Sequence, residues 1–350
     1  VASLKYDYQF GTRGAGTIED VIDDVKYVQK GSLIYLYEPT TAPIQFARVA
    51  LNSFTKLPFW NSRTDSSESN VYGRWPYRDQ NIDTEVRLKL AATSGINVQM
   101  DSVDSTGAAT NFFDNGHDGA PFLLYDTAAV DWNYVVVRSV TSATSVQVDI
   151  VGTMAGTEYT GGNHTYKWSE SAWSDYRGWP RAATFYDSRL IWGGNASEPS
   201  KLWGSQVNDL YELTNADIET AKTAGVNSDY FRLNLTSERQ DRIQWLKSAR
   251  SLWVGTETRE FILEPSDPAA TIGRSNAPKN SAETEVGSAY VQPVLVNNSL
   301  TFCQRSSQGI RDIIFNESEN AYVTRDLSVL AEHLHKKSYE NIVTPNSSKI

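Results

Sequence analysis

Short apolar segments recur along the chain, and most of them are rich in Val, Ile, Tyr, Phe and Trp. They are bounded by Gly, Asn, Asp, Ser or Thr, a pattern that is typical of β-strands. Clear examples are Leu33–Tyr37, Glu85–Leu90, Tyr134–Val140 and Ser145–Val151. In the last of these, apolar and polar residues alternate, which predicts one buried and one solvent-facing side.

Helical spacing of apolar residues is confined to a few short segments. Residues 18–25, 215–223 and 327–337 are the candidates, and none of them is longer than about three turns. The sequence therefore predicts an all-β protein with few short helices.

Four groups of strand-like segments share one order: an apolar strand, a polar turn, a strand led by a leucine, a second turn and a third strand. The leucines are Leu33, Leu190, Leu252 and Leu300, and the last two intervals are 62 and 48 residues. A four-stranded propeller blade takes about 40–50 residues. The first interval is longer by about 100 residues, which predicts an insertion with strands of its own. A β-sandwich would also offer such strands, and the pattern alone leaves that alternative open.

We therefore expect a β-propeller-like body with an inserted β domain. The expected division is an N-terminal segment over 1–24, a first blade over 25–70, an inserted β-rich domain over 71–165 and further blades over 166–350. The chain begins with Val1 and its two Met residues are internal, so we expect a segment of a longer protein. At most four blade-like units fit in it, and a closed propeller usually has more.

Composition and charge exclude several classes of protein. The chain has 350 residues, with 32 Lys and Arg against 42 Asp and Glu, for a net charge of −10. A nucleic-acid-binding protein needs an excess of Lys and Arg to displace counterions from phosphates, so the negative net charge argues against that class. The single Cys303 excludes an intramolecular disulfide network and a multi-cysteine zinc site, and in an apolar strand it predicts a buried thiol. No apolar run approaches the roughly 18 residues of a membrane helix, so no membrane insertion is expected.

Candidate catalytic and metal-binding patterns are weak. The acidic run at 19–24 could supply paired carboxylates to a glycosidase, but a solvated turn or helix face is the commoner cause. Asp114–Gly119 has oxygen donors and glycines like a calcium loop, yet it lacks the bidentate Glu, which favours a plain turn. His333 and His335 have no third ligand nearby. The glycines of 11–16 lack the Gly-Lys-Ser of a phosphate loop. We expect no enzymatic activity, no metal and no cofactor.

Ten tryptophans are spread through the chain, and most lie in or beside predicted strands. Those in the predicted blade strands should pack between blades: Trp192, Trp203, Trp245 and Trp253. A second group precedes a Gly-aromatic-Pro turn, where packing or subunit contact is expected and stacking on a sugar is the alternative: Trp168, Trp173 and Trp179.

The densest motif runs from residue 173 to 211. A Gly-aromatic-Pro turn is followed by an aromatic strand, an Arg-Leu pair, an apolar strand ending in Gly, a Pro and a Trp-x-Ser. This order resembles the tail nozzle proteins of short-tailed double-stranded DNA bacteriophages, also called tail tubular protein B or stabilisation proteins. Weaker similarity extends over residues 25–50 and 130–335. The residues that carry the motif are Trp173, Gly178, Pro180, Arg189, Leu190, Gly193, Pro199, Trp203 and Ser205.

The resemblance implies a structural virion protein of the phage tail, without enzymatic activity. It implies a homo-oligomeric ring, expected to be a hexamer, that docks on the tail adaptor protein and anchors tail fibres or spikes. The ring would close and extend the channel through which phage DNA is ejected. An acidic chain suits that role, because excess carboxylates repel phosphates at close range.

Within the motif, the Arg189 guanidinium is expected to bind backbone carbonyls or a carboxylate while Leu190 enters the core. Trp203 and Ser205 should share one face of their strand. Two alternatives to the nozzle remain: a carbohydrate-binding, host-adhesion β-propeller of a virion, and a tail-associated glycan hydrolase.

Overall fold

The predicted fold class is confirmed by the computed structural model, in which nearly all regular structure is β-strand. The one complete helical element in the described part of the chain is a 3-10 helix, η3 (Asn115–His117). The predicted helices at 18–25, 215–223 and 327–337 lie almost wholly outside that part. The structure describes residues 24–50, 53–58, 74–129, 131–156, 162–213, 229–235, 241–273, 276–297, 299–305, 309–318, 321–329 and 342.

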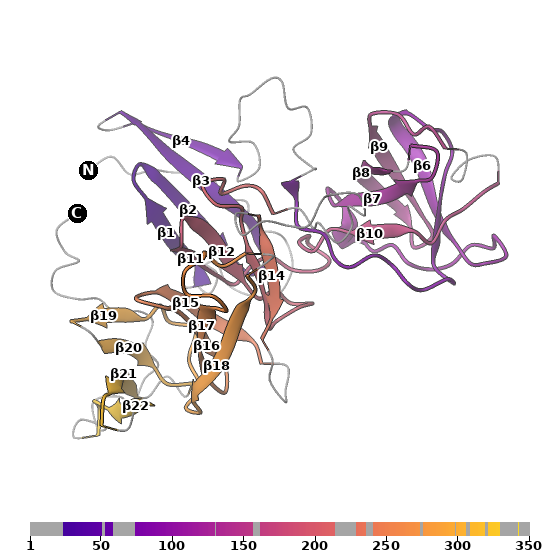
Figure 1. Cartoon of the computed structure of the whole chain (residues 1–350). Helices are drawn as coiled ribbons and strands as arrows, with labels where there is room; N and C mark the ends of the chain where they lie inside the picture. The colour runs from indigo at the N-terminus through magenta and orange to yellow at the C-terminus, as the bar shows by residue number, and fades with distance from the viewer. Residues whose placement is uncertain are drawn as a thin grey trace.

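Four antiparallel four-stranded sheets form the body, each with its strands in sequence order (Figure 1). The first consists of β1 (Lys26–Lys30), β2 (Leu33–Glu38), β3 (Thr41–Ala50) and β4 (Ser53–Pro58). The second consists of β11 (Ala182–Tyr186), β12 (Arg189–Gly193), β13 (Lys201–Gly204) and β14 (Phe231–Asn234). The third consists of β15 (Ile243–Ser248), β16 (Leu252–Thr256), β17 (Glu260–Pro265) and β18 (Pro278–Thr284). The fourth consists of β19 (Val294–Val296), β20 (Ser299–Cys303), β21 (Ile310–Asn316) and β22 (Ala321–Asp326).

These sheets have the up-and-down order of propeller blades. Leu33 and Leu252 begin the second strand of their sheets, and Leu190 and Leu300 are the second residues of theirs. The repeated Leu therefore marks one structural position. The fourth strand of each sheet was not predicted from the sequence.

Adjacent sheets pack face to face. Since alternate residues of each strand point to opposite sides, one strand can contact the sheets on both sides of its own. In β12, Ile191 lies in the core shared with the third sheet, whereas Trp192 packs edge-on against Tyr37 of the first sheet, with ring centroids 5.8 Å apart. Trp245 of β15 packs on Phe302 of the fourth sheet at 5.9 Å. Packing between blades, as predicted, explains these tryptophans.

The first strands of successive sheets lie side by side, β1 next to β11 and β11 next to β15. The segment that precedes β19 contacts residues of the first sheet and the residue just before β11. There the Tyr290 hydroxyl donates to the Arg181 carbonyl at 3.0 Å, and the Arg181 guanidinium lies 3.9 Å from the centre of the Tyr290 ring. The Gln292 amide donates to the Tyr37 hydroxyl at 2.7 Å. The fourth sheet is thereby linked to the first two.

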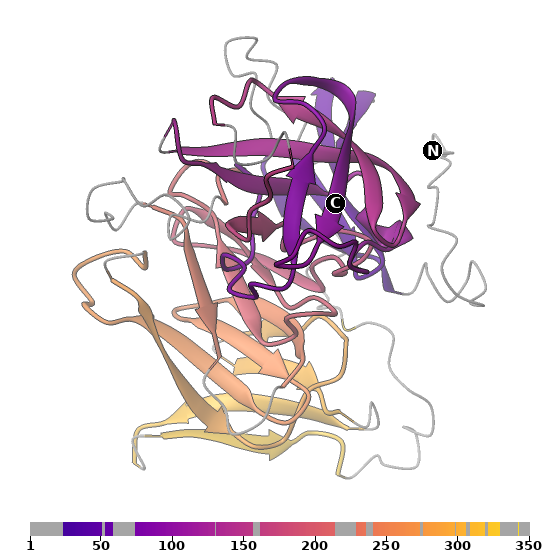
Figure 2. The same cartoon turned by 90° about the vertical axis from the view of Figure 1, so that its right-hand side faces the viewer.

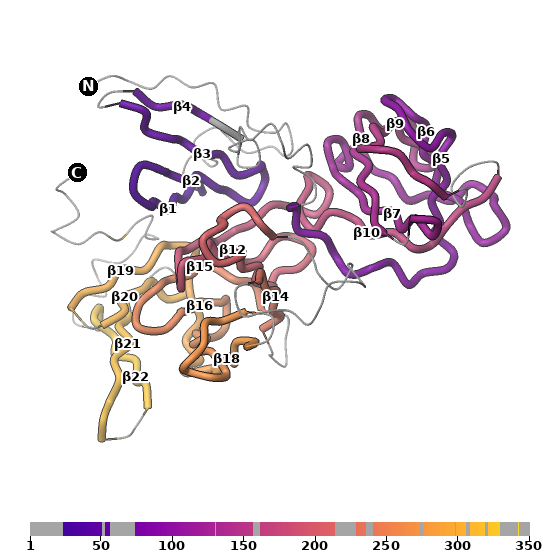
Figure 3. The backbone as a smooth tube through the Cα atoms, turned by 45° about the horizontal axis from the view of Figure 1, so that its top comes forward, coloured from indigo at the N-terminus to yellow at the C-terminus, as the bar shows by residue number. Residues whose placement is uncertain are grey.

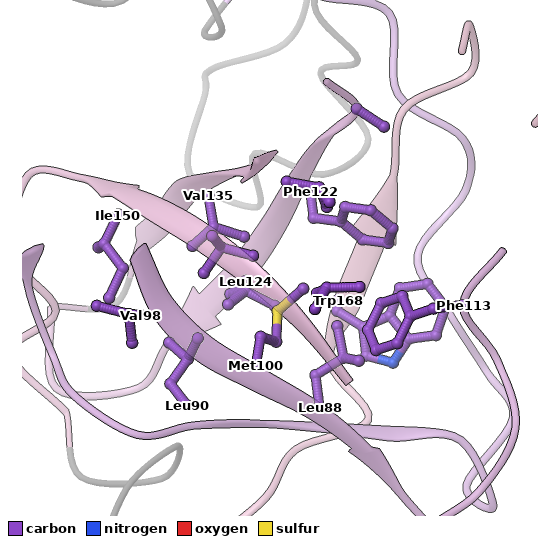
Figure 4. Packing of buried hydrophobic residues seen from close by; sticks show 14 of the residues in the cluster. Leu88, Leu90, Val98, Met100, Phe113, Phe122, Leu124, Val135, Ile150 and Trp168 are labelled. Carbon is purple, nitrogen blue, oxygen red and sulfur yellow. The ribbon is translucent and has the colours of Figure 1, made fainter. Parts of the chain in front are cut away.

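A six-stranded sheet is inserted between the first and second four-stranded sheets, in the order β10-β7-β8-β9-β6-β5. It stands beside the body (Figure 3) and faces the viewer in Figure 2, with the third and fourth sheets below it. Its apolar core is separate and lies against the concave side of the strands (Figure 4). Its strands are β5 (Arg87–Leu90), β6 (Gly95–Val103), β7 (Pro121–Asp126), β8 (Asp131–Ser142), β9 (Ser145–Val151) and β10 (Trp168–Glu170).

The inserted sheet extends past residue 165, where the inserted domain was expected to end. Strand β10 pairs with β7, Trp168 lying opposite Leu124, so this strand belongs to the inserted sheet. Trp168 accordingly lies in the core of that sheet rather than with Trp173 and Trp179, which belong to the core between the first and second four-stranded sheets. The division at 24, 70 and 165 otherwise stays a prediction. Among the described residues, no helix has the length and apolar character needed to cross a membrane.

Candidate functional site

Three of the motif residues, Trp173, Leu190 and Trp203, lie in the apolar cluster between the first sheet, the second sheet and the insertion. Trp173 is fully buried there, 5.7 Å from the Trp192 ring and 5.4 Å from the Trp203 ring, in edge-to-face contacts. The same apolar cluster contains Tyr37 from β2 and Trp132 from β8. Edge-to-face aromatic pairs stabilise a core beyond the area that they bury. These rings are therefore structural and are not available to stack on a ligand.

Arg189 acts as predicted from the sequence. Its side chain is fully buried, and its Nη1 donates to the backbone carbonyls of Ser205 at 2.5 Å and Asp229 at 2.6 Å. Burial lowers the pKa of the guanidinium to about 10, which still leaves it charged at neutral pH. Leu190 lies in the core, and its backbone N–H donates to the Ser205 hydroxyl at 3.0 Å. Arg189 thus joins β12 to the segments that follow β13 and precede β14.

The glycines and prolines of the motif allow close approaches of the backbone. Gly178 has a φ of +85°, and a Cβ at this position would lie 2.8 Å from the Cβ of Ala196. Gly193 would bring a Cβ within 3.1 Å of Ile243 in the third sheet. The Pro199 carbonyl accepts a hydrogen bond from the Ile243 N–H at 2.9 Å, and Pro180 is buried.

The strand β13 ends at Gly204, so the predicted shared face of Trp203 and Ser205 is not tested within it. Trp203 packs toward the first sheet, whereas Leu202 packs toward the third. Ser205 is buried just beyond the end of this strand. The assignment of the nine motif residues as one structural set stays a prediction; seven of them are buried.

A separate pocket of about 410 Å³ opens between the insertion and the segment before β11. The loop 78–83 lines it, and Val86, Phe112 and Trp168 are its other apolar lining residues, which we call the apolar base. Glu170, Arg177 and Glu198 complete the lining. None of the nine motif residues lines this pocket.

A buried charged cluster forms the wall of the pocket. Glu170 is 2% exposed, and its carboxylate accepts two hydrogen bonds at 2.9 Å from the Nε of Arg177 and one at 2.5 Å from Nη2. His117 is fully buried, and its Nδ1 accepts from the Asp114 N–H at 2.9 Å. This places the His117 proton on Nε2, which lies 3.2 Å from Glu170 Oε1.

The pKa of Glu170 reflects two opposing causes. Burial disfavours the carboxylate, but hydrogen bonds from His117 and Arg177, and the positive charge of Arg177, hold the pKa below its ordinary value. Glu170 is therefore ionised at neutral pH and fully engaged by protein donors. It lacks the properties of a general acid, which needs a raised pKa.

The Asp114–Gly119 loop is the plain turn that was favoured over a calcium loop. Asp114 caps η3, its Oδ1 accepting from the Gly116 N–H at 2.9 Å. The Tyr176 ring stacks 4.2 Å from the His117 ring, and the Tyr176 N–H donates to the Gly116 carbonyl at 2.9 Å. This turn therefore clamps the insertion to the motif segment. In the part of the chain that the structure covers, no group of three His, Cys, Asp or Glu side chains could hold a metal ion.

The other sequence candidates are partly visible. Cys303 is a buried thiol, as predicted, and burial raises its pKa to about 12. Of the acidic run at 19–24, only Asp24 is described, and its carbonyl accepts from the Tyr290 hydroxyl at 3.2 Å. His333 and His335 lie outside the described residues. The pocket itself was not predicted, because its lining comes from segments between residues 78 and 198 that no local pattern connects.

The fold defines an all-β, propeller-like protein with an inserted sheet. No known family matches the chain, and no curated protein does.

Among solved structures, the chain is similar to the phage phi92 endosialidase, with 11% identity over 89% of this chain and 47% of that chain, at a TM-score of 0.25. It is similar to Hsv2 of Kluyveromyces lactis, with 8% identity over 86% of this chain and 96% of that chain, at a TM-score of 0.24. It is also similar to a mutant Aleuria aurantia lectin in complex with a fucosyl-GlcNAc, with 9% identity over 84% of this chain and 90% of that chain, at 0.22. The chain spans about half the length of the endosialidase. At these values the similarities assign no function.

Proposed function

We propose that the chain is a structural subunit of a bacteriophage tail nozzle and has no enzymatic activity. The observation that carries this proposal is the position of the motif that resembles the nozzle family. Trp173, Leu190 and Trp203 of the motif belong to the core shared by the first sheet, the second sheet and the insertion. Gly193 and Pro199 contact Ile243 of the third sheet, and seven of the nine motif residues are buried. A motif in such a position serves to hold large parts in fixed orientation, which is the demand on a ring subunit.

The proposal includes a homo-oligomeric ring, with six subunits as the expected number, in the virion tail. Its partners would be the tail adaptor protein and tail fibres or spikes. Phage DNA would pass through the ring without specific binding. The net charge of −10 supports this last point, because carboxylates repel phosphates at short range.

Imaging of the purified chain by negative-stain electron microscopy tests the proposal. We expect ring-shaped particles with a central channel and six-fold symmetry in class averages. Particles of single-subunit size at micromolar concentration, with no rings at any salt concentration, would contradict it.

Two alternatives lead to different results. A tail-associated hydrolase needs an acid and a base at a suitable separation, and Glu170, the buried carboxylate of the pocket, is ionised and bound by Arg177. A carbohydrate-binding, host-adhesion propeller remains a rival. Binding of a glycan by a chain that stays monomeric would favour it; Trp179 belongs to the buried core, so its substitution does not test a stacking contact.

A further inference from the structure

The pocket between the insertion and the body lies apart from the nine motif residues. A pocket of about 410 Å³ is large enough for a small ligand, since such sites span roughly 300–1,000 Å³. The proposed nozzle function does not involve this pocket. Its lining combines an apolar base with a ring of polar groups, which is the composition of a binding site.

The base offers apolar surface. The Trp168 Nε1 donates to the Val86 carbonyl at 3.0 Å, so this indole needs no ligand acceptor. Phe112 is half-buried, packs on Trp168 with ring centroids 4.9 Å apart, and contributes to the base. Ile82, which is 90% exposed, lies in the loop along the pocket. An aromatic ring beside exposed aliphatic surface suits the C–H face of a sugar ring.

The polar groups include both donors and acceptors. Arg177 uses its Nε–H and one Nη2–H on Glu170, which leaves the two N–H groups of Nη1 and the second of Nη2 as donors. Glu198 lines the pocket and binds Lys201 through Oε1, and its buried Oε2 has no hydrogen-bond partner among the described residues, so a ligand would have to shift this side chain to reach it. Asp83 uses Oδ1 on the Glu85 N–H, which leaves Oδ2 as an acceptor. A ligand that both donates and accepts would satisfy these groups together.

Charge narrows the class of ligand. The pocket is lined by two arginines and four carboxylates. Three of the carboxylates are paired with cations, Glu170 with Arg177, Glu198 with Lys201 and Asp79 with Arg232. Because the charges of the lining are largely compensated, a strongly charged ligand of either sign is disfavoured. Hydroxyl groups are neutral and can donate and accept. We propose that this pocket binds a neutral saccharide of one or two sugar units and rejects acidic saccharides.

The experiment is an array of neutral oligosaccharides paired with their sialylated counterparts, probed with the full chain. The strongest neutral glycan is then titrated by calorimetry. Phe112→Leu keeps an apolar side chain but removes the flat ring, and Asp83→Asn keeps the turn acceptor but removes the charge. The matched controls are Phe315→Leu, at an exposed position on β21, and Asp267→Asn, whose Oδ1 accepts from the Ala269 N–H in a turn that does not line the pocket.

We expect binding of neutral glycans, with signals at least tenfold above those of the sialylated partners. Phe112→Leu and Asp83→Asn should each weaken binding at least tenfold, and the controls should leave it unchanged. Absence of glycan binding, preference for the sialylated partner, or equal loss in the controls would overturn the proposal. Binding of a fluorescent lysine tripeptide that is lost in Asp83→Asn, without glycan binding, would assign the pocket to a basic side chain instead.

The ring and the pocket are tested separately. Particle images of the same samples report whether the ring persists in the pocket variants. Intact rings without glycan binding would contradict only the saccharide site, whereas glycan binding by a monomeric chain would contradict only the nozzle proposal.

Discussion

At the scale of single residues, Arg189 and Glu170 make the buried polar contacts that join segments of the chain. The sequence was sufficient to predict that Leu190 would be buried and that Arg189 would bind either backbone carbonyls or a carboxylate; the structure shows the carbonyls of Ser205 and Asp229. The sequence was not sufficient to predict the partner of Glu170. Arg177 is only seven residues away, but His117 comes from a distant turn, and only the fold brings it within 3.2 Å.

Replacement of Arg189 tests the buried hydrogen bonds. We expect Arg189→Met to lower the free energy of unfolding by about 2–4 kcal/mol, because the carbonyls of Ser205 and Asp229 lose their donor in a buried site. Arg138→Met is the control, since Arg138 is 56% exposed and its ion pair with Asp149 should contribute under about 1 kcal/mol. Urea denaturation measures both. Equal effects of the two substitutions would contradict the assigned role.

The Glu170 carboxylate should make stability depend on pH. Its pKa is lowered in the folded chain, so its contribution is complete above the ordinary value of 4.5 and is lost as the pH falls through the lower folded value. We expect Glu170→Gln to cost about 3 kcal/mol at pH 7, because Arg177 loses its buried counterion. The difference from the unmodified chain should narrow as the pH falls below 4.5. A difference that is the same at pH 3.5 and pH 7 would show that the charge has no part in it.

At the scale of elements, the first three strands of each sheet were predictable and the fourth was not. The second strands and most third strands are apolar because they pack between sheets, as in β12, β16 and β20. The fourth strand β18, with the sequence Pro-Lys-Asn-Ser-Ala-Glu-Thr, lies at an edge, and only its two end residues are buried. Edge strands avoid continuous apolar surface, so they lack the pattern by which strands are predicted.

Paired glycine and aromatic residues position neighbouring strands. Gly255 of β16 lies directly opposite Trp245 of β15, and a Cβ on Gly255 would overlap the Trp245 ring. We expect Gly255→Ala to destabilise the chain by about 1–3 kcal/mol through this overlap. In a double-mutant cycle with Trp245→Leu, the pair should cost less than the two single changes together. Strictly additive costs would contradict the packing argument.

At the scale of the whole molecule, the sequence indicated a set of blades with a large insertion, and the structure has four such sheets and a six-stranded insertion. The pocket could not be predicted from the sequence, because its lining residues come both from the insertion and from the segment that follows it. Sequence periodicity reports which face of one element is buried. It does not report which polar loops meet when two bodies dock.

The acidic balance makes a prediction for the whole chain. A conduit should let DNA pass, so we expect no retention of double-stranded DNA at about 0.15 M salt, where charges are screened over about 8 Å. An electrophoretic mobility shift assay measures this. Micromolar binding at that salt concentration would contradict the conduit role, whatever the oligomeric state.

The central claim is that the chain is a ring-forming structural subunit. The mass of the particle in solution, measured by light scattering after size-exclusion chromatography, tests it most directly. We expect a closed assembly with about six times the 39.0 kDa mass of the chain. A single species with the mass of one chain, unchanged by concentration, would contradict it.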